Sequence, residues 1–168
     1  MAANEQHFRG QLVALLPRLR RFCAGLTRNG DAGDDLCQAT IERALSQAHR
    51  FEPGTRLDSW MYRIARNLQI DTVRRRRTRG VELDIDEAFD LAGDDGVAIV
   101  ERRSDLSAVE TALAGLPADQ RALVTLVIID GQSYRDAASI LDIPIGTVMS
   151  RLARARRAID TAVRGTVQ

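Results

Sequence analysis

The first stretch with a clear hydrophobic pattern lies between residues 12 and 26, where apolar side chains recur three and four positions apart. This spacing places them on one face of a helix. We therefore predict an amphipathic helix that packs on other helices. Its apolar positions are Leu12, Leu15, Leu16, Leu19, Phe22, Cys23 and Leu26.

Similar patterns predict a second and a third helix. Residues 29–33, rich in Gly and Asp, indicate a turn, and the second helix is expected to begin within 31–35, because acidic side chains suit the positive end of a helix. A Pro-Gly pair at 53–54 indicates a loop, after which Asp58 or Ser59 can cap the third helix. The inward positions are expected to be Leu36, Cys37, Thr40, Ile41, Ala44 and Leu45, then Trp60, Ile64, Leu68 and Val73.

The helical pattern stops at residues 81–104, which are acidic and lack periodicity. A flexible linker is the simplest interpretation, and a short helix over 86–91 is the alternative. Helical spacing returns at Leu106, is interrupted by Pro117 and continues in further segments to about Val163.

No segment shows the alternation of a strand, so the chain is predicted to be all-α. Two small helical bundles are expected, joined by an acidic flexible linker, and the second bundle contains a helix-turn-helix. The expected boundaries are 1–80, 81–104 for the linker, and 105–168.

The helix-turn-helix is predicted from residues 133–157. Ser133 is placed to cap a helix that has small residues in its middle, where two helices can cross closely. Residues 142–146 form a tight connection, and a helix follows from Thr147 to Arg157. In proteins with this pattern the second helix enters the major groove of DNA.

Within that second helix, one face is apolar and the other is polar and basic. The core-facing positions are expected to be Val148, Leu152, Ala155 and Ile159. Arginine can bridge guanine edges or bind phosphate, so the opposite face predicts DNA contact; a solvated basic helix in an ordinary bundle is the alternative. The candidate contact residues are Thr147, Ser150, Arg151, Arg154 and Arg157.

Charge is distributed unevenly although the net charge is only +1. All 24 basic residues are Arg. Residues 60–80 hold seven Arg and one Asp, a net charge of +6, whereas 81–105 hold nine acids and two Arg, a net charge of −7. Residues 133–164 carry six Arg and three Asp, a net charge of +3. Two basic blocks around an acidic one indicate two polyanion-binding surfaces.

Several function classes are disfavoured. No apolar stretch is long enough to cross a bilayer, and the start of the chain lacks a signal-peptide core, so a cytoplasmic protein without membrane insertion is expected. Cys23 and Cys37 match no metal or redox motif and are expected to be buried free thiols. We expect no metal, no cofactor and no small-molecule substrate. No paired carboxylates, phosphate-binding glycine loop or nucleophile–base pair indicates an enzyme.

The second bundle resembles a known family. Residues 116–121 (LPADQR), 131–134 (GQSY) and 146–156 (GTVMSRLARAR) are similar to the C-terminal domain of extracytoplasmic-function (ECF) RNA polymerase sigma factors. The resemblance implies that the last helix reads the −35 promoter element. Met149 departs from the family, in which a basic residue is common at this position.

The first bundle resembles the same family. Residues 34–44 (DDLCQATIERA) are similar to the helix that docks on the clamp of the polymerase, which implies polymerase contacts by Asp34, Asp35, Gln38 and Arg43. Residues 51–67 and the arginine run after them resemble the segment that recognises and opens the −10 element. The implied DNA contacts are Phe51, Arg56, Arg63, Asn67, Arg74, Arg75, Arg76 and Arg77.

The resemblance implies a sigma factor that directs core RNA polymerase to promoter DNA, in a stress response, with an anti-sigma factor as a further partner. Residues 51–55 and the short second domain are similar to the general-stress subgroup. Two other functions stay open from the residues alone. One is a stand-alone helix-turn-helix regulator, and the other is a sigma-like decoy that titrates an anti-sigma factor.

Overall fold

The computed structural model describes residues 2–27, 30–52, 54–80 and 105–165, and these contain helices and no strand. The all-α prediction is confirmed. The acidic segment 81–104, for which a linker was predicted, lies outside the described residues.

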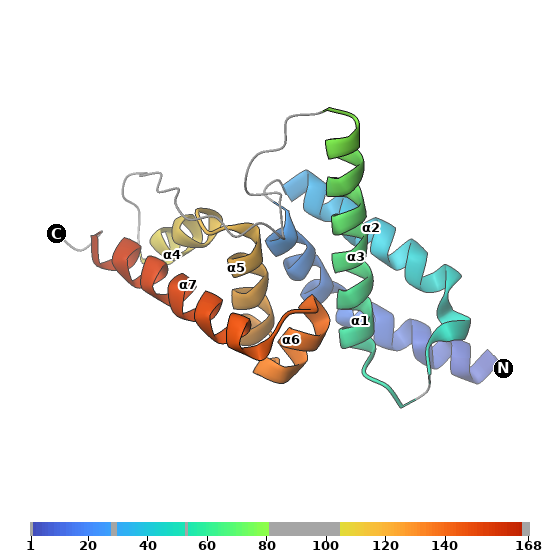
Figure 1. The fold of residues 1–168 in the computed structure, drawn as a ribbon. Coiled ribbons are helices and arrows are strands. Elements are labelled where there is room, and N and C mark those ends of the chain that lie inside the picture. The colour runs from blue at the N-terminus through green and yellow to red at the C-terminus, as the bar shows by residue number, and fades with distance from the viewer. Residues whose placement is uncertain (1, 28–29, 53, 81–104, 166–168) are drawn as a thin grey trace.

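The first bundle consists of three long helices and one short one (Figure 1). The elements are α1 (Ala2–Leu26), α2 (Gly30–Ser46), the 3-10 helix η1 (Ala48–Arg50) and α3 (Leu57–Thr78). Each long helix packs on the other two.

The predicted apolar stripe of α1 is buried, with only Leu16 partly exposed. Phe22 contacts Tyr62 of α3, with 4.7 Å between ring centroids. Near the start of α1, Phe8 lies against Phe51 and Trp60 at 5.6 and 6.3 Å. The helix begins at Ala2, well before the predicted start, and Phe8 extends its buried face by one turn.

Three local predictions for the first bundle are wrong. The predicted turn at 29–33 is helical from Gly30 onward, because Gly33 serves a helix contact instead. A Cβ on Gly33 would lie 3.0 Å from the Ala24 Cα of α1. The side chain of Leu45, expected to point inward, is 48% exposed. Helix α3 begins at Leu57, so neither Asp58 nor Ser59 is its cap.

The second bundle consists of α4 (Asp105–Ala114), α5 (Ala118–Leu123), the π-helical turn η3 (Val124–Ile129), α6 (Tyr134–Leu141) and α7 (Ile145–Gly165). These elements group together on the other side of the molecule from α2 (Figure 1). The helical spacing predicted after Pro117 is thus present, and the helix widens to π geometry over Val124–Ile129.

The helix-turn-helix prediction is confirmed in its geometry. The Ser133 side chain accepts a hydrogen bond from the Asp136 backbone amide at 3.0 Å and caps α6. Asp142 has a φ of 52° and ends α6 in the left-handed region, which asparagine and aspartate tolerate better than most residues. Helix α7 begins at Ile145, slightly before the predicted Thr147. Its predicted inward positions are buried or, at the last one, partly buried: Val148, Leu152, Ala155 and Ile159.

The two bundles pack directly on each other, which the sequence did not predict. Helix α1 contacts α5 and η3, and α3 contacts α6. The contact is close at Gly25, where a Cβ would lie 3.1 Å from the Thr125 Oγ1 and 3.6 Å from the Arg121 carbonyl oxygen. The buried residues of both bundles form one continuous hydrophobic cluster.

Candidate nucleic-acid and polymerase interface

The outer face of α7 presents most of the predicted DNA-contacting residues. Ser150, Arg154 and Arg157 are exposed and lie four and three positions apart, so they share one face of the helix. Thr147 is half-buried at the start of the helix. The exposed side chain of Met149 lies next to this row. This face can offer a hydroxyl and two guanidinium groups to DNA.

Arg151 differs from these neighbours. Its side chain is 17% exposed, and its Nε lies 3.0 Å from the Asp119 Oδ2 of α5. This ion pair ties α7 to the first turn of α5. The structure therefore places Arg151 within the bundle and not on the face that the sequence predicted.

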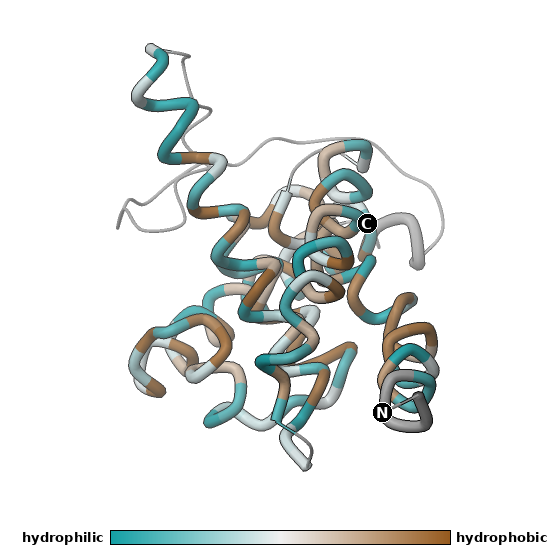
Figure 2. Tube along the Cα trace, turned by 90° about the vertical axis from the view of Figure 1, so that its right-hand side faces the viewer, coloured by the Kyte–Doolittle hydropathy of each residue, from teal (hydrophilic) through white to brown (hydrophobic). Residues whose placement is uncertain are grey.

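Helix α3 presents a second basic surface at its C-terminal end. Arg63 and Asn67 are exposed and lie four positions apart on one face. Residues 74–77 are all arginines and all exposed, and they lie on the part of α3 that projects beyond the bundle (Figure 1). In Figure 2 this projecting end is mostly hydrophilic. Four adjacent cations on a projecting helix end suit a polyphosphate chain.

Phe51 and Arg56, the remaining predicted −10 contacts, are engaged within the protein. Phe51 is half-buried, with its ring centroid 5.3 Å from that of Trp60. The Arg56 guanidinium donates to Asp58 at 2.8 Å in its own bundle. It also donates to Gln132 at 2.6 Å and to Asp136 at 2.8 Å, both in the second bundle.

Gln132 completes this polar cluster between the bundles. Its amide nitrogen donates to Asp58 at 2.9 Å, while its oxygen accepts from Arg56. Burial alone would raise the pKa of the Asp58 carboxyl, but hydrogen bonds from Arg56, Gln132 and a backbone amide outweigh it and hold the pKa well below its usual range. Asp58 is therefore ionised between two domains.

A second polar cluster centres on Asp130, whose side chain is only 3% exposed. The Arg18 guanidinium donates to both carboxylate oxygens, at 2.8 and 3.0 Å, and also reaches Asp58 at 3.2 Å. The Tyr62 hydroxyl also donates to Asp130. Burial and the bond to this carboxylate together raise the pKa of Tyr62 far above its usual range.

Arg121 of α5 makes a third connection between the bundles. Its side chain is buried, and it donates to the carbonyl oxygens of Gly25 at 3.3 Å and Thr27 at 3.1 Å, at the end of α1. It also donates to the Leu116 carbonyl in its own bundle. Hydrogen bonds to three carbonyl oxygens compensate for the free-energy cost of burying this guanidinium group. Sequence reasoning missed Arg18, Tyr62, Arg121, Asp130 and Gln132, because their partners are far away in the chain.

The predicted polymerase-contacting residues lie exposed on α2. The Arg20 guanidinium of α1 binds Asp34 through two hydrogen bonds of 2.6 and 2.7 Å, which lower the pKa of this carboxyl. The Gln38 amide donates to Glu42 at 3.1 Å on the same face. Asp35 and Arg43 are also exposed. These four residues share a helix but not a single row of side chains.

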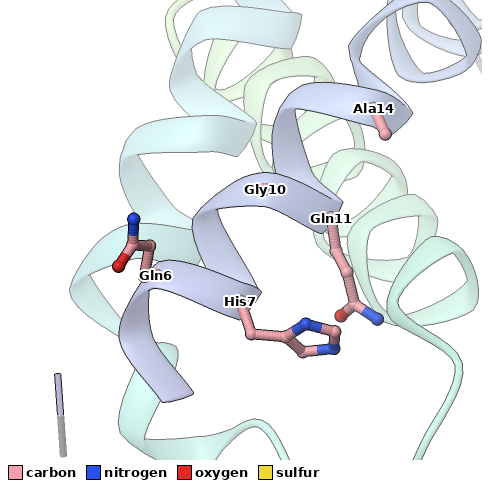
Figure 3. A pocket seen from close by; sticks show the side chains of 5 residues that line it. All are labelled: Gln6, His7, Gly10, Gln11 and Ala14. Atoms are coloured by element: carbon pink, nitrogen blue, oxygen red, sulfur yellow. The ribbon is translucent and has the colours of Figure 1, made fainter. Parts of the chain in front are cut away.

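Further features of the described residues concern the other function classes. An open depression on α1 is lined by Gln6, His7, Gly10, Gln11 and Ala14, all from this one helix (Figure 3). No group of three or more potential metal ligands occurs among the described residues. Cys23 and Cys37 are buried free thiols, as expected. In the same residues no helix is both long and apolar enough to cross a bilayer.

The fold and the exposed surfaces define a two-domain, helical DNA-binding protein with a helix-turn-helix in its second domain. Comparisons with known proteins give the family. Residues 12–79 match the family model for sigma-70 region 2, and residues 106–159 match the model for sigma-70 region 4.

Similar proteins cover nearly the whole chain. The ECF sigma factor EcfG of Rhodopseudomonas palustris is 38% identical over 88% of this chain and 80% of its own length. The ECF sigma factor SigC of Mycobacterium tuberculosis is 37% identical over 83% of this chain and 74% of its own. The solved structure of the sigma factor RpoE with the anti-sigma factor NepR, from Bartonella quintana, matches with a TM-score of 0.73 and 33% identity, covering 95% of this chain and 98% of that one.

The chain belongs to the ECF RNA polymerase sigma factors. It is a sigma factor for transcription initiation and not an enzyme.

Proposed function

We propose that this sigma factor binds core RNA polymerase through α2 and directs it to a promoter with separate −10 and −35 elements. The observation that supports this most is the pair of exposed arginine surfaces, one in each domain, at the end of α3 and along α7. A single DNA-binding surface would suffice for a stand-alone regulator.

The proposed polymerase contacts are Asp34, Asp35, Gln38 and Arg43 on α2. The proposed −10 contacts on α3 are Arg63, Asn67 and the run 74–77, which suits the phosphates of a melted strand. The proposed −35 contacts on α7 are Thr147, Ser150, Arg154 and Arg157.

The protein nucleates promoter opening, and the polymerase supplies most of the energy. Unstacking costs about 1.4 kcal/mol per base-pair step. Stacking one captured base on protein returns about 1–3 kcal/mol. One or two captured bases cannot hold open a bubble of many steps, so the isolated protein binds promoter DNA weakly and in a salt-sensitive way.

An anti-sigma factor regulates this protein in the proposed scheme, and both act in the cytoplasm in a stress response. The support is the likeness to RpoE, which was solved in complex with NepR. The partner would cover the polymerase- and DNA-binding surfaces.

Run-off transcription with purified core polymerase and a randomised promoter library tests the proposal. We expect the complex to select templates with two conserved elements, and Arg154→Ala to remove selection at −35 while polymerase binding persists. Selection of a palindromic operator without polymerase would instead support a stand-alone regulator. Binding to an anti-sigma factor without any DNA selection would support a decoy.

A further inference from the structure

The outer face of α7 near its start consists of small residues. Gly146, Ser150 and Ala153 lie four and three positions apart, so they share one face of the helix, and all three are exposed. A Cβ built on Gly146 would meet no other part of the protein within 4 Å. In a helix-turn-helix, the first residues of the second helix contact base edges in the major groove. Small residues at this place let the helix backbone approach the bases closely.

Two long side chains border this row of small residues. Successive helix positions are rotated by about 100°, so Met149 lies about 100° from Ser150 in one direction and Arg154 about 40° in the other. The Met149 side chain is 54% exposed, more than any other large apolar side chain of the described second domain. Arg154 is exposed as well. The face that meets DNA thus has a cationic side and an apolar side.

The apolar side cannot read a base by donating a hydrogen bond. Methionine has no N–H or O–H group, and its thioether sulfur is only a weak acceptor. In the major groove guanine presents two acceptors, cytosine a donor and adenine one of each, whereas thymine presents a C5 methyl group. Covering a polar base edge with Met149 would leave that edge without a partner, which costs free energy. A thymine methyl group is the base feature that an apolar side chain can bury with gain.

The residue next to Met149 does not supply the missing donor. The Ser150 hydroxyl donates to the Thr147 carbonyl oxygen at 3.1 Å, within the helix. A serine hydroxyl has one proton, so in this arrangement Ser150 can accept a hydrogen bond from a base but not donate one. A guanine facing Met149 would therefore find no donor on Ser150 either.

We propose that Met149 determines the base preference at one position of the −35 element, by packing its side chain against the C5 methyl group of a thymine in the major groove. This inference rests on the −35 role proposed for α7. Arg154, on the other side of the row, contacts a different position of the element.

The first measurement is a promoter selection by the full-length protein bound to core polymerase, from duplexes randomised over the −35 element. The wild type should prefer thymine over guanine by about tenfold at one position. Met149→Ala should lose this preference and keep the others, and Met149→Leu should retain it. The control is Ile128→Ala, which shortens an apolar side chain that is 48% exposed in the same domain but outside α7. This control should select as the wild type does.

The second measurement replaces the preferred thymine with deoxyuridine, which pairs with adenine in the same way and lacks only the methyl group. The two duplexes compete for the same polymerase complex, and the ratio of bound duplexes gives the ratio of affinities. The wild type should bind the deoxyuridine duplex about fourfold more weakly, the effect of one buried methyl group. Met149→Ala should bind the two duplexes equally.

Equal binding of the two duplexes by the wild type would overturn the inference. A loss of affinity that Met149→Ala shows to the same extent would overturn it too, because another residue would then read the methyl group. If the polymerase complex has no base preference anywhere in the −35 element, the role proposed for α7 is wrong, and the inference with it. A preference at −35 that includes no thymine leaves the role of α7 standing and refutes only that of Met149.

Discussion

The two ends of α3 have different surroundings although both carry arginine. At the start of the helix, Arg56 and Asp58 are bonded to side chains of the second domain. At its end, residues 74–77 project from the bundle and are exposed. Basic composition alone thus does not identify a DNA-binding surface. The two ends differ in whether the guanidinium group is bonded to side chains of the other domain or is exposed at the surface.

The same difference occurs in α7. Arg151 and Arg154 are three positions apart and are chemically identical. Arg151 is paired with Asp119, whereas Arg154 is exposed. Substitutions should therefore distinguish arginines that stabilise the fold from arginines that are exposed for binding DNA.

The largest effect is expected from replacing Arg74, Arg75, Arg76 and Arg77 together with Ser. The affinity for a single-stranded −10 oligonucleotide should fall by more than about a hundredfold at low salt, because about four phosphate contacts are lost. The slope of log K against log salt should decrease by about 3. Anisotropy titrations at several salt concentrations measure both.

A control with the same change in net charge replaces four exposed arginines elsewhere. These are Arg9, Arg135, Arg156 and Arg164. If this control weakens binding as much as the first variant does, general charge and not the end of α3 governs binding.

Arg121→Ala should lower the free energy of unfolding by about 2–4 kcal/mol, because the substitution leaves buried carbonyls at the end of α1 without a donor. Urea titration followed by circular dichroism gives this value. Arg135→Ala, at an exposed site of α6, should change it by less than about 0.5 kcal/mol. Similar values for the two variants would mean that Arg121 does not hold the domains together.

Arg154→Ala and Arg151→Ala should act on different properties. Arg154→Ala should weaken the binding free energy for the −35 element by about 1–3 kcal/mol and leave the free energy of unfolding unchanged. Arg151→Ala should lower stability by about 1 kcal/mol, because its half-buried ion pair with Asp119 is lost. The free energy of unfolding of each variant is measured by urea titration, and the transcription that each supports is measured on one promoter. The reverse result would place Arg151 on the DNA.

Asp58→Asn should lower the free energy of unfolding by about 1 kcal/mol at neutral pH. The pKa of Asp58 is lower in the folded protein than in the unfolded chain, where it is about 4. The ionised carboxylate therefore stabilises the folded protein at pH values above about 4. This contribution is lost as the pH falls through the folded-state pKa. The difference between wild type and variant should be constant from pH 6 to 8 and shrink below about pH 4. A difference that grows in acid would contradict the assigned direction.

The sequence predicted those features whose causes are local. The cap at Ser133 and the inward row of α7 depend on residues a few positions away, and both are present. The pairing of Arg56 and Arg151 within the protein was not predicted, because their partners are distant in the chain. Arg56 pairs with a residue 80 positions away, and no pattern within a helix reveals such a partner.

The direct contact between the domains could not be predicted from the sequence either. Gly25 and Gly33 were not recognised as points of close helix packing, because a glycine in a helix gives the same signal as one in a turn. Tyr62 gave no signal of its own, since its buried hydroxyl is satisfied by Asp130 of the other domain.

Binding to core polymerase followed by promoter-dependent run-off transcription is the most direct test of the whole account. Purified core enzyme should bind the chain and then start transcripts at one position on a template that carries both elements, and neither component should do so alone. A core enzyme that neither binds this chain nor changes its start sites in its presence would contradict the account.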